Sequence, residues 1–326
     1  MILKARAKLN LTLKVLGVRP DGYHDIESVV QSIDLCDRIS LKTSPPIPAE
    51  SGSKETDIKV TCDDTSIPGG RGNLAVDAAL ALARFAGLKA SVEMNIEKGI
   101  PVAAGLGGGS ADAAAVLIGL NHLWQLGLCP AELMAVGEEL GADIPFCIAG
   151  GTGIIRGKGE RVESLPTPDD LWFIVVTLPE KISTAWAYAK FDELIQATGA
   201  HNTDACSTNL YDTDAYDTSV AATCATSKMI RAMRTGKAQD IAERLSDAND
   251  LERAAVSIIP SIAGVKQALL AAGAAGVGMS GSGPTVFGLT DSREKAQEIL
   301  GALERMSKGG KEAFVCQAVP QGVINA

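Results

Sequence analysis

Residues Pro101 to Ala111 read PVAAGLGGGSA, with four glycines within five residues and an alanine-rich, helix-forming stretch directly after them. Glycine lets the backbone adopt unusual dihedral angles and lets a ligand approach the N–H groups closely. The first turn of the following helix adds N–H groups without intrahelical partners and the positive end of the helix dipole. The segment therefore predicts a phosphate-binding loop at a helix start. The alternative interpretation is a flexible turn between a strand and a helix.

Two familiar phosphate-binding patterns do not match this loop. A P-loop requires a lysine after its last glycine, and Ser110 and Ala111 stand there instead. The dinucleotide-binding and protein-kinase patterns both require G-x-G-x-x-G, and Ser110 occupies the position of the third glycine. The loop therefore predicts phosphate binding of a different kind.

The chain has 326 residues, with 30 Lys and Arg against 39 Asp and Glu, so its net charge is −9. At roughly 150 residues per domain, this length predicts two domains or one large one. A protein that coats nucleic acid gains most of its affinity from clustered Lys and Arg, so the acidic balance argues against nucleic acid as a partner. No apolar run reaches about 18 residues, so no membrane-spanning helix is expected.

The cysteine and histidine content indicates a cytoplasmic protein. The seven cysteines form no C-x-x-C pair, and several lie in apolar surroundings, which is typical of reduced, buried thiols. The three histidines are too scattered along the chain to indicate a zinc site. The N-terminal stretch is interrupted by Lys4, Arg6, Lys8 and Lys14, so we do not expect a secretory signal.

Hydrophobic periodicity predicts a mixture of strands and helices. Apolar and polar residues alternate from Lys8 to Val15, which predicts a strand with one buried face and with Lys8 and Asn10 side by side on the other. Further strands are expected at 37–42, 91–96 and 171–178, and helices at 73–85, 110–124, 130–141, 229–245 and 262–272.

Two composition changes bear on domain organisation. The tract Gly199–Ser219 is polar and acidic with short side chains, which predicts a loop. A shift near Gly150–Gly159 suggests the domain boundary, so we expect an N-terminal domain at 1–155 and a C-terminal domain at 156–326.

Several other residues can carry chemistry, although each has a plainer interpretation. The second glycine-rich segment, Gly273–Gly283, is typical of a tight turn, and becomes functional if it forms a second small-residue wall beside a phosphate. Lys8 is compatible with a solvated strand face, and Asp143 with a helix N-cap or a loop. Tyr23 and His24 follow a turn, where a loop aromatic and a surface histidine are equally expected.

In combination these segments resemble the GHMP kinase superfamily, over Lys4 to about Leu289. The phosphate-loop motif of the superfamily is matched by PVAAGLGGGSADAAA and its C-terminal glycine-rich motif by GVGMSGSGPTVF. The stretch AKLNLTLKVLGVRPDGYHDIES is similar to one branch, in which K-x-N-x-x-L precedes R-x-D-G-Y-H. Members that act on homoserine, mevalonate or galactose lack the D-G-Y-H loop.

The resemblance implies a fold and a reaction. The expected fold class is α+β, with an N-terminal ribosomal-protein-S5-domain-2-like domain, a C-terminal ferredoxin-like α/β domain and the active site in the interdomain cleft. The implied activity is transfer of the γ-phosphoryl group of ATP to the 2-hydroxyl of a CDP-linked methylerythritol, in the non-mevalonate isoprenoid pathway. ATP and Mg²⁺ are the implied cofactors.

The resemblance also implies residue roles. Lys8 and Asp143 form the catalytic pair, and Asn10 holds a hydroxyl of the methylerythritol. His24 hydrogen-bonds the cytosine, which stacks between Tyr23 and Tyr188; STAWAY, which ends at Tyr188, itself predicts a helix start. The residues implied to bind ATP are Pro101, Val102, Ala103, Ala104, Gly105, Leu106, Gly107, Gly108, Gly109, Ser110 and Ala111, with Asn73 and Lys98 at the adenine end. Ser110 is the hydroxyl placed to reach Mg²⁺.

Two rival functions remain at this point. One is a GHMP kinase for another small alcohol, which has no base to stack against Tyr188. The other is a non-catalytic ATP-binding sensor with the same fold, against which the presence of both Lys8 and Asp143 argues. The expected partner is a small-molecule substrate, without nucleic acid or membrane, and the protein is expected to be a monomer or weak homodimer.

Overall fold

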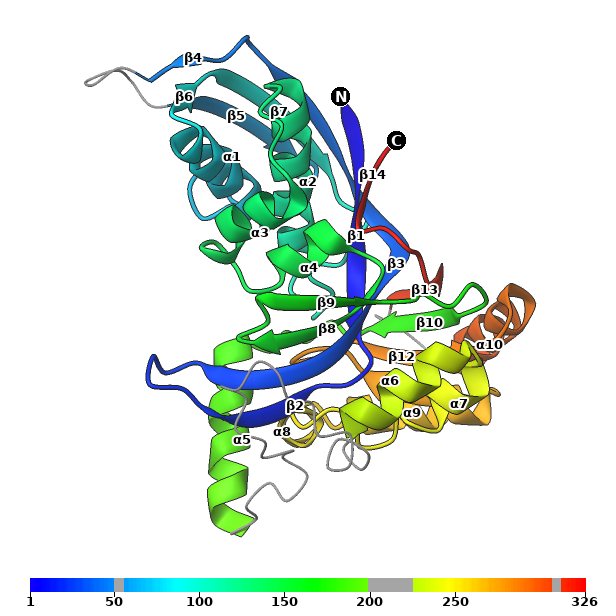
Figure 1. Ribbon diagram of the computed structural model, residues 1–326. Coiled ribbons are helices and arrows are strands. Elements are labelled where there is room, and N and C mark those ends of the chain that lie inside the picture. Colours follow the sequence, from blue (N-terminus) through cyan, green and yellow to red (C-terminus); the bar gives the residue numbers. More distant parts are fainter. Residues whose placement is uncertain (50–55, 199–224, 307–311) are drawn as a thin grey trace.

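The computed structural model describes residues 1–49, 56–198, 225–306 and 312–326 and contains two main sheets (Figure 1). The first sheet is organised by β3 (His24–Thr43), whose second half pairs with β1 (Ile2–Asn10) and β7 (Ser91–Glu97). Its first half pairs with β2 (Lys14–Val18) and β8 (Thr152–Gly157). The remaining strands of this sheet are β5 (Asp57–Cys62), β9 (Arg161–Leu165) and β14 (Val323–Asn325).

The strand predictions at this end of the chain are partly wrong. β3 extends well beyond the expected 37–42, because residues 28–33 are buried on both faces and show no alternation. The expected strand from Lys8 to Val15 is broken, since β1 ends at Asn10 and β2 begins at Lys14. Its polar side is also buried: Lys8 is 5% and Asn10 2% exposed, because this side faces the interior beside the glycine-rich loop.

Four helices accompany the first sheet: α1 (Leu74–Phe85), α2 (Gly108–Leu123), α3 (Pro130–Glu138) and α4 (Ile144–Ala149). The central one is α2, which contacts the other three helices as well as β1 and β3. Its alanines Ala111 and Ala113–Ala115 are fully buried, so small side chains let the helix approach the sheet closely. The predicted helices at 73–85, 110–124 and 130–141 are confirmed, with ends displaced by a few residues.

The second sheet has the strand order β11-β12-β10-β13, and every pair in it is antiparallel. Its strands are β10 (Trp172–Thr177), β11 (Gly276–Met279), β12 (Val286–Thr290) and β13 (Glu312–Gln317). In chain order this is a 4-1-3-2 sheet, with helices between β10 and β11 and between β12 and β13, which is the ferredoxin-like arrangement. The predicted combination of two mixed α and β units is confirmed.

The helices of the second half connect these strands. They are α5 (Thr184–Thr198), α6 (Ala225–Thr235), α7 (Ala238–Ala242), α8 (Glu252–Ile258), α9 (Ser261–Ala271) and α10 (Arg293–Met306). The single helix expected at 229–245 is wrong, because Gly236 adopts φ +69° between α6 and α7 and ends the first of them. The polar tract Gly199–Ser219 lies outside the described residues. A short sheet of β4 (Ile47–Pro48) and β6 (Leu88–Lys89) completes the described strands.

The two sheets are not separated at the expected boundary. The step from residue 155 to 156 falls inside β8, and both β8 and β9 belong to the first sheet. The C-terminal β14 also returns to pair with β1. The glycines near residue 155 serve turns instead, since Gly150, Gly151, Gly157 and Gly159 all have positive φ.

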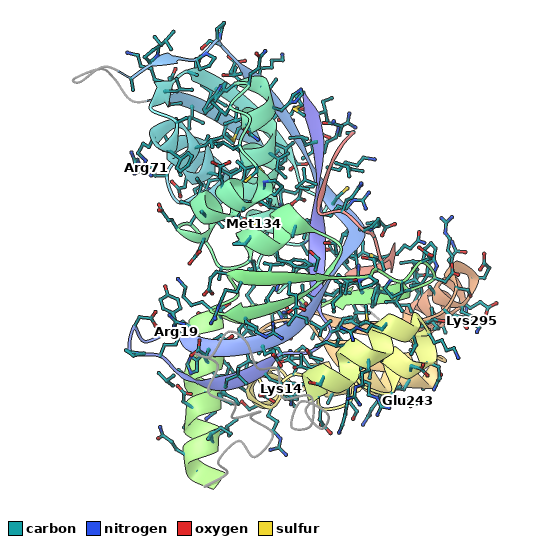
Figure 2. All side chains as sticks on the ribbon, viewed as in Figure 1. Lys14, Arg19, Arg71, Met134, Glu243 and Lys295 are labelled. Carbon is teal, nitrogen blue, oxygen red and sulfur yellow. The ribbon has the colours of Figure 1, made fainter. Side chains whose placement is uncertain are left out.

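One set of contacts between the two halves of the molecule lies at β2. Lys14, labelled in Figure 2, has its Nζ 2.7 Å from Asp250 Oδ1, just before α8, and both side chains are largely buried. The Val15 N–H donates to the other oxygen of Asp250, at 2.9 Å. These contacts join the two halves of the molecule just after β1, which carries the predicted functional residues Lys8 and Asn10.

The helices and thiols within the described ranges bear on membrane and disulfide expectations. No single helix there is long and apolar enough to cross a membrane; α8 and α9 reach that length only together, and they meet at 112°. The five cysteines that fall within the described ranges are free thiols, and burial raises the pKa of Cys147 and Cys316.

A pair of glycine substitutions tests the packing of the second sheet. A Cβ at Gly276 would lie 2.6 Å from the carbonyl oxygen of Ala242, so we expect Gly276→Ala to lower the free energy of unfolding. Overpacking of this kind costs about 1–3 kcal/mol. Gly264 in α9 has open space around it, and Gly264→Ala should raise stability by roughly 0.5–1 kcal/mol. Urea unfolding measures both, and equal effects would contradict the packing argument.

Candidate active site

A cavity of about 1090 Å³ lies between the two halves of the molecule, and its lining includes residues from both. Nearly all residues that the sequence singled out line this one cavity: Lys8, Asn10, Tyr23, His24, Asn73, Lys98, Pro101–Ser110, Asp143 and Tyr188. Ala111 is not part of this lining, because it is fully buried within α2. The lining therefore gives no support to the prediction that Ala111 binds ATP.

The loop Pro101–Ala111, which we call the phosphate loop, needs glycine for two reasons. Gly105 and Gly107 have φ of +78° and +72°, and a Cβ at Gly105 would lie 2.7 Å from the carbonyl oxygen of Ser280. Gly107 is also the N-cap of α2, which begins two residues earlier than the sequence predicted. No side chain caps this helix and no acidic residue lies in its first turn, so its N–H groups remain suited to an anion.

The phosphate loop is fastened by the second glycine-rich segment. Ser280 Oγ donates to the Gly105 carbonyl at 3.0 Å, and Thr285 Oγ1 donates to the Ala104 carbonyl at 2.5 Å. The Lys8 N–H donates to the Leu106 carbonyl at 2.9 Å. Because these donors are largely buried, they hold the loop in one shape, and the second segment is more than a tight turn.

Lys8 and Asp143 meet in the cavity although they lie far apart in the sequence. Lys8 Nζ lies 3.3 Å from Asp143 Oδ2 and donates to Asn10 Oδ1 at 2.6 Å. Asp143 occupies the N-cap position of α4, but its side chain makes no capping hydrogen bond. Asn10 Nδ2 donates to Ser28 Oγ at 2.9 Å, which fixes the amide and thereby the direction of the ammonium group.

The aromatic residues are arranged differently from the prediction. The ring that stacks on Tyr188 is that of His24, with centroids 4.6 Å apart and an interplanar angle of 24°. His24 Nε2 also lies 3.0 Å from Asp192 Oδ1 on α5. Tyr23 is 62% exposed, and Lys158 Nζ lies 5.5 Å from its ring centroid. Tyr23 precedes β3 and His24 begins it, and both residues line the cavity, so the stacking of cytosine between Tyr23 and Tyr188 stays a prediction.

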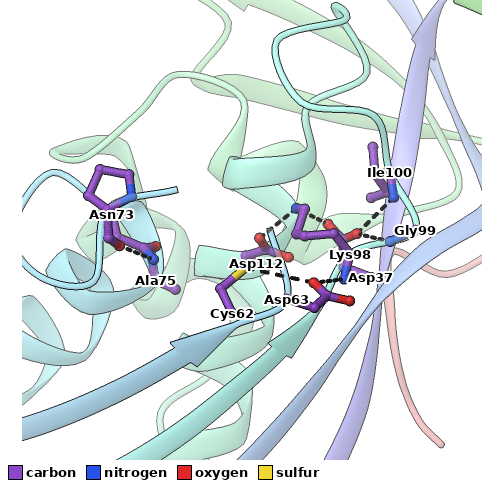
Figure 3. A network of polar contacts seen from close by, with 10 residues as sticks. Asp37, Cys62, Asp63, Asn73, Ala75, Lys98, Gly99, Ile100 and Asp112 are labelled. Carbon is purple, nitrogen blue, oxygen red and sulfur yellow. Dashed lines mark hydrogen bonds and ion pairs between the residues drawn. The ribbon is translucent and has the colours of Figure 1, made fainter. Parts of the chain in front are cut away.

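Asn73 and Lys98 line the cavity, but their side chains are occupied by protein contacts (Figure 3). Asn73 caps α1: its Oδ1 accepts from the Ala75 N–H at 3.0 Å, and its Nδ2 donates to the Pro68 carbonyl at 3.1 Å. Lys98 Nζ pairs with Asp37 and, at 2.9 Å, with Asp112 Oδ2. A buried ammonium requires such partners, and the contact of either side chain with adenine stays a prediction.

The net charge of the buried group formed by Asp37, Lys98 and Asp112 depends on the protonation of Asp112. Burial and the neighbouring Asp37 raise the pKa of Asp112 to about 8, although Lys98 acts in the opposite direction. Asp112 is therefore largely protonated at neutral pH. With Lys98 positive and Asp37 negative, the group then carries no net charge beneath the phosphate loop.

The residues around the cavity suit a metal that arrives with phosphate. Among the residues that the structure describes, no three His, Cys, Asp or Glu side chains gather as a metal cage. Mg²⁺ in phosphate-transferring sites commonly takes one or two protein oxygens, with waters and phosphate oxygens as its other ligands. Ser110 and Asp143 offer such oxygens in the same cavity.

Sequence reasoning missed three charged residues of the cavity, namely Lys158, Asp192 and Asp112. Lys158 stands between two glycines in the turn from β8 to β9, and Asp192 lies one helical turn after Tyr188 on α5. A lysine in a glycine turn and an i, i+4 pair are weak signals, because solvated residues show the same patterns.

Comparisons with known proteins show the family of the chain. GHMP kinases N terminal domain matches residues 73–151, and GHMP kinases C terminal matches residues 229–309. The chain is 38% identical to a 4-diphosphocytidyl-2-C-methyl-D-erythritol kinase of Gloeobacter violaceus, covering 99% of this chain and 95% of that protein. It is 42% identical to the protein of the same name from Pelotomaculum thermopropionicum, covering 92% and 93%.

Solved structures give the same result. A crystal structure of 4-(cytidine 5'-diphospho)-2C-methyl-D-erythritol kinase matches with a TM-score of 0.70 and 28% identity, covering 98% of this chain and 100% of that chain. A homoserine kinase from Cytophaga hutchinsonii matches with a TM-score of 0.72, covering 99% and 96%. At 20% identity, that second likeness shows a shared fold alone.

The raised pKa of Asp112 predicts a pH dependence of stability. An unfolded carboxyl group has a pKa of about 3.9, whereas in the folded protein burial raises the pKa of Asp112 to about 8. The folded state therefore retains a proton that the unfolded chain has lost, and stability should fall as pH rises from about 4 to 8 and then level off.

Asp112→Asn removes this titration and provides the comparison. Urea unfolding at several pH values should show the difference between the variant and the parent protein growing in the variant's favour up to about pH 8. Parallel stability curves for the two proteins would contradict the assignment.

Proposed function

Because this chain belongs to the GHMP kinase family, and within it to the 4-diphosphocytidyl-2-C-methyl-D-erythritol kinases, we propose that it phosphorylates the 2-hydroxyl of that substrate from ATP. The products are the 2-phosphate and ADP, and the reaction belongs to the non-mevalonate isoprenoid pathway. The observation that carries the proposal is the approach of Lys8 to Asp143, 3.3 Å apart, in the cavity lined by the phosphate loop.

The phosphate loop binds the β- and γ-phosphates of ATP in this proposal. The uncapped N-terminus of α2 supplies N–H donors and the positive end of the helix dipole. Ser280 and Thr285 hold the loop carbonyls from behind, so the loop is shaped before ATP arrives. A preformed loop costs less ordering on binding, which favours affinity.

Lys8 and Asp143 act on the acceptor hydroxyl. Phosphoryl transfer requires positioning and charge stabilisation more than covalent help. Asp143 accepts the proton of the 2-hydroxyl, and Lys8, fixed by Asn10, orients Asp143 and polarises the acceptor oxygen. Because the transition state is loose, proton loss can lag behind bond breaking and a weak base suffices.

Mg²⁺ fits this arrangement through Ser110, with Asp143 as a second oxygen in the same cavity. The ion would neutralise charge on the phosphates when bound. The other charged groups near the phosphates belong to the chain. They are Lys8 and the buried group of Asp37, Lys98 and Asp112, which carries no net charge.

The cytidine end of the substrate lies at α5 in this proposal. His24 and Tyr188 form a stacked pair there, and Asp192 fixes the His24 ring. Since His24 already covers one face of Tyr188, a cytosine stacks on this pair or displaces His24 from it. Tyr23 and Lys158 border the cavity beside it, where a cation suits the diphosphate of the substrate.

Two alternatives are separated by one assay. A coupled kinase assay that offers the CDP-linked methylerythritol, homoserine and mevalonate should show turnover of the first alone. Turnover of another alcohol would indicate a different GHMP kinase, and ATP binding without turnover would indicate a sensor. The expectations of a cytoplasmic monomer or weak homodimer stay predictions.

The catalytic pair is tested by Asp143→Asn and Lys8→Ala. Each should lower kcat by about 10²-fold or more, in the range of general acid–base groups. Asp170→Asn and Lys42→Ala are matched controls at exposed positions outside the cavity. Near-parental turnover in either cavity variant would contradict the assignment, provided that circular dichroism shows a folded protein.

The base site is tested by His24→Ala. Stacking of a base on an aromatic side chain is worth about 1–3 kcal/mol, so KM for the cytidine substrate should rise by about tenfold. KM for ATP should stay within twofold, because in this proposal His24 contacts the cytidine and the phosphate loop binds ATP. An equal rise of both KM values would argue that His24 is structural.

A further inference from the structure

Both ends of the phosphate loop are joined by one buried polar group, Asp37, Lys98 and Asp112 (Figure 3). The chain enters the loop after β7, at residues 98–100, and leaves it through Gly107 into α2. Lys98 belongs to the entry and Asp112 to the first turns of α2, and Lys98 Nζ lies 2.9 Å from Asp112 Oδ2. This hydrogen bond therefore connects the two ends directly across the loop.

Asp37 on β3 fixes the entry side. Its Oδ1 accepts from the N–H groups of Gly99 and Ile100, at 2.7 Å and 2.8 Å, and its Oδ2 pairs with Lys98. A Cβ at Gly99 would overlap the carbonyl oxygen of Cys36, so the entry is pressed against β3. The entry segment consequently follows the first sheet with little freedom.

The exit side is fixed through Asp112, which contacts both Lys98 and Asp37. The side chains of Asp37, Lys98 and Asp112 are 0%, 8% and 5% exposed. Gly108 lies directly against the ammonium, since a Cβ there would be 3.5 Å from Lys98 Nζ. Because the whole contact is buried, water competes little for it, and it holds the start of α2 relative to β3.

One oxygen of the group is unused: Asp112 Oδ1 is buried and has no hydrogen-bond partner among the described residues. Lys98 and Asp112 both line the cavity. The group therefore lies at the boundary between the core and the ligand space, where a small displacement would be transmitted to the loop N–H groups.

We propose that Lys98 is a positioning residue for ATP, which sets the separation between the two ends of the phosphate loop by bridging Asp37 and Asp112. This role rests on the proposed function, in which the loop binds ATP. Loss of the bridge leaves the loop free to fluctuate, so ATP must order it on binding and the phosphates are aligned less well.

Two substitutions at one position provide the test. Asp112→Asn keeps an acceptor for Lys98, so KM for ATP should stay within twofold at pH 7. Asp112→Leu removes the bridge across the loop but leaves Lys98 paired with Asp37, so no buried charge is stranded. KM for ATP should then rise by about tenfold and kcat should fall, while KM for the cytidine substrate stays unchanged.

A second variant covers failure of Asp112→Leu to fold. The double variant Lys98→Met with Asp37→Asn also removes the bridge without an unpaired charge, and the amide oxygen that replaces the carboxylate at position 37 can still accept from the loop entry. Hydrogen exchange of the amides at residues 103–109 should be faster in each variant that lacks the bridge. Lys266→Met, which breaks a half-buried ion pair with Glu252, is the control for a simple loss of stability.

Different outcomes test the proposed function and the positioning role of Lys98 separately. Calorimetric titration of the parent protein with ADP tests the phosphate loop itself, and absence of binding would overturn the proposed function. If the parent binds ADP, an unchanged KM for ATP in the bridge-deficient variants overturns the positioning role. A parallel rise of both KM values, as expected from general loosening, overturns it too.

Discussion

The N–H of Lys8 donates to the Leu106 carbonyl, and the ammonium of the same residue lies 3.3 Å from Asp143. One residue of β1 thus fixes the exit of the phosphate loop by its backbone and the acceptor end of the cavity by its side chain. The distance between the exit of the phosphate loop and the acceptor end of the cavity is therefore set by the length of one lysine side chain. Any shift of β1 would alter both at once, which explains why β1 is buried on both faces where it ends.

The second half of the molecule supports this arrangement from behind. The Asn10 N–H donates to Ser280 Oγ, and Ser280 Oγ donates in turn to the Gly105 carbonyl. Asn249 Nδ2 binds the carbonyls of Met279 and Gly281, which fixes the same segment from the α8 side. Because buried polar groups are costly when unpaired, this network favours one relative placement of the two halves. The shape of the cavity between the two halves is therefore fixed by the same buried hydrogen bonds that stabilise the fold.

The sequence predicted the site correctly where only one residue type suits the backbone conformation of a position. The glycines of the phosphate loop could be recognised because positive φ and close backbone approach exclude other residues. Lys8 and Asp143 could be paired only through the family resemblance, since nothing local connects residues so far apart. The surroundings of Lys98 were out of reach for the same reason: Asp37 and Asp112 come to it from β3 and α2 by topology. The stacking of His24 on Tyr188 could not be read from the sequence either, because β3 and α5 are brought together by the fold.

The charge of the cavity differs from that of the protein. The chain has a net charge of −9, and both proposed ligands are anions. Three lysines, Lys8, Lys98 and Lys158, line the cavity together with Asp112, Asp143 and Asp192. Since the pKa of Asp112 is raised to about 8, that carboxyl is largely neutral at pH 7, and the lysines then balance the two remaining carboxylates and Asp37 behind them. Because Asp112 is buried and neutral, the cavity does not carry the net negative charge that the whole chain has. The N–H groups of the phosphate loop then make the potential in the cavity favourable for anions.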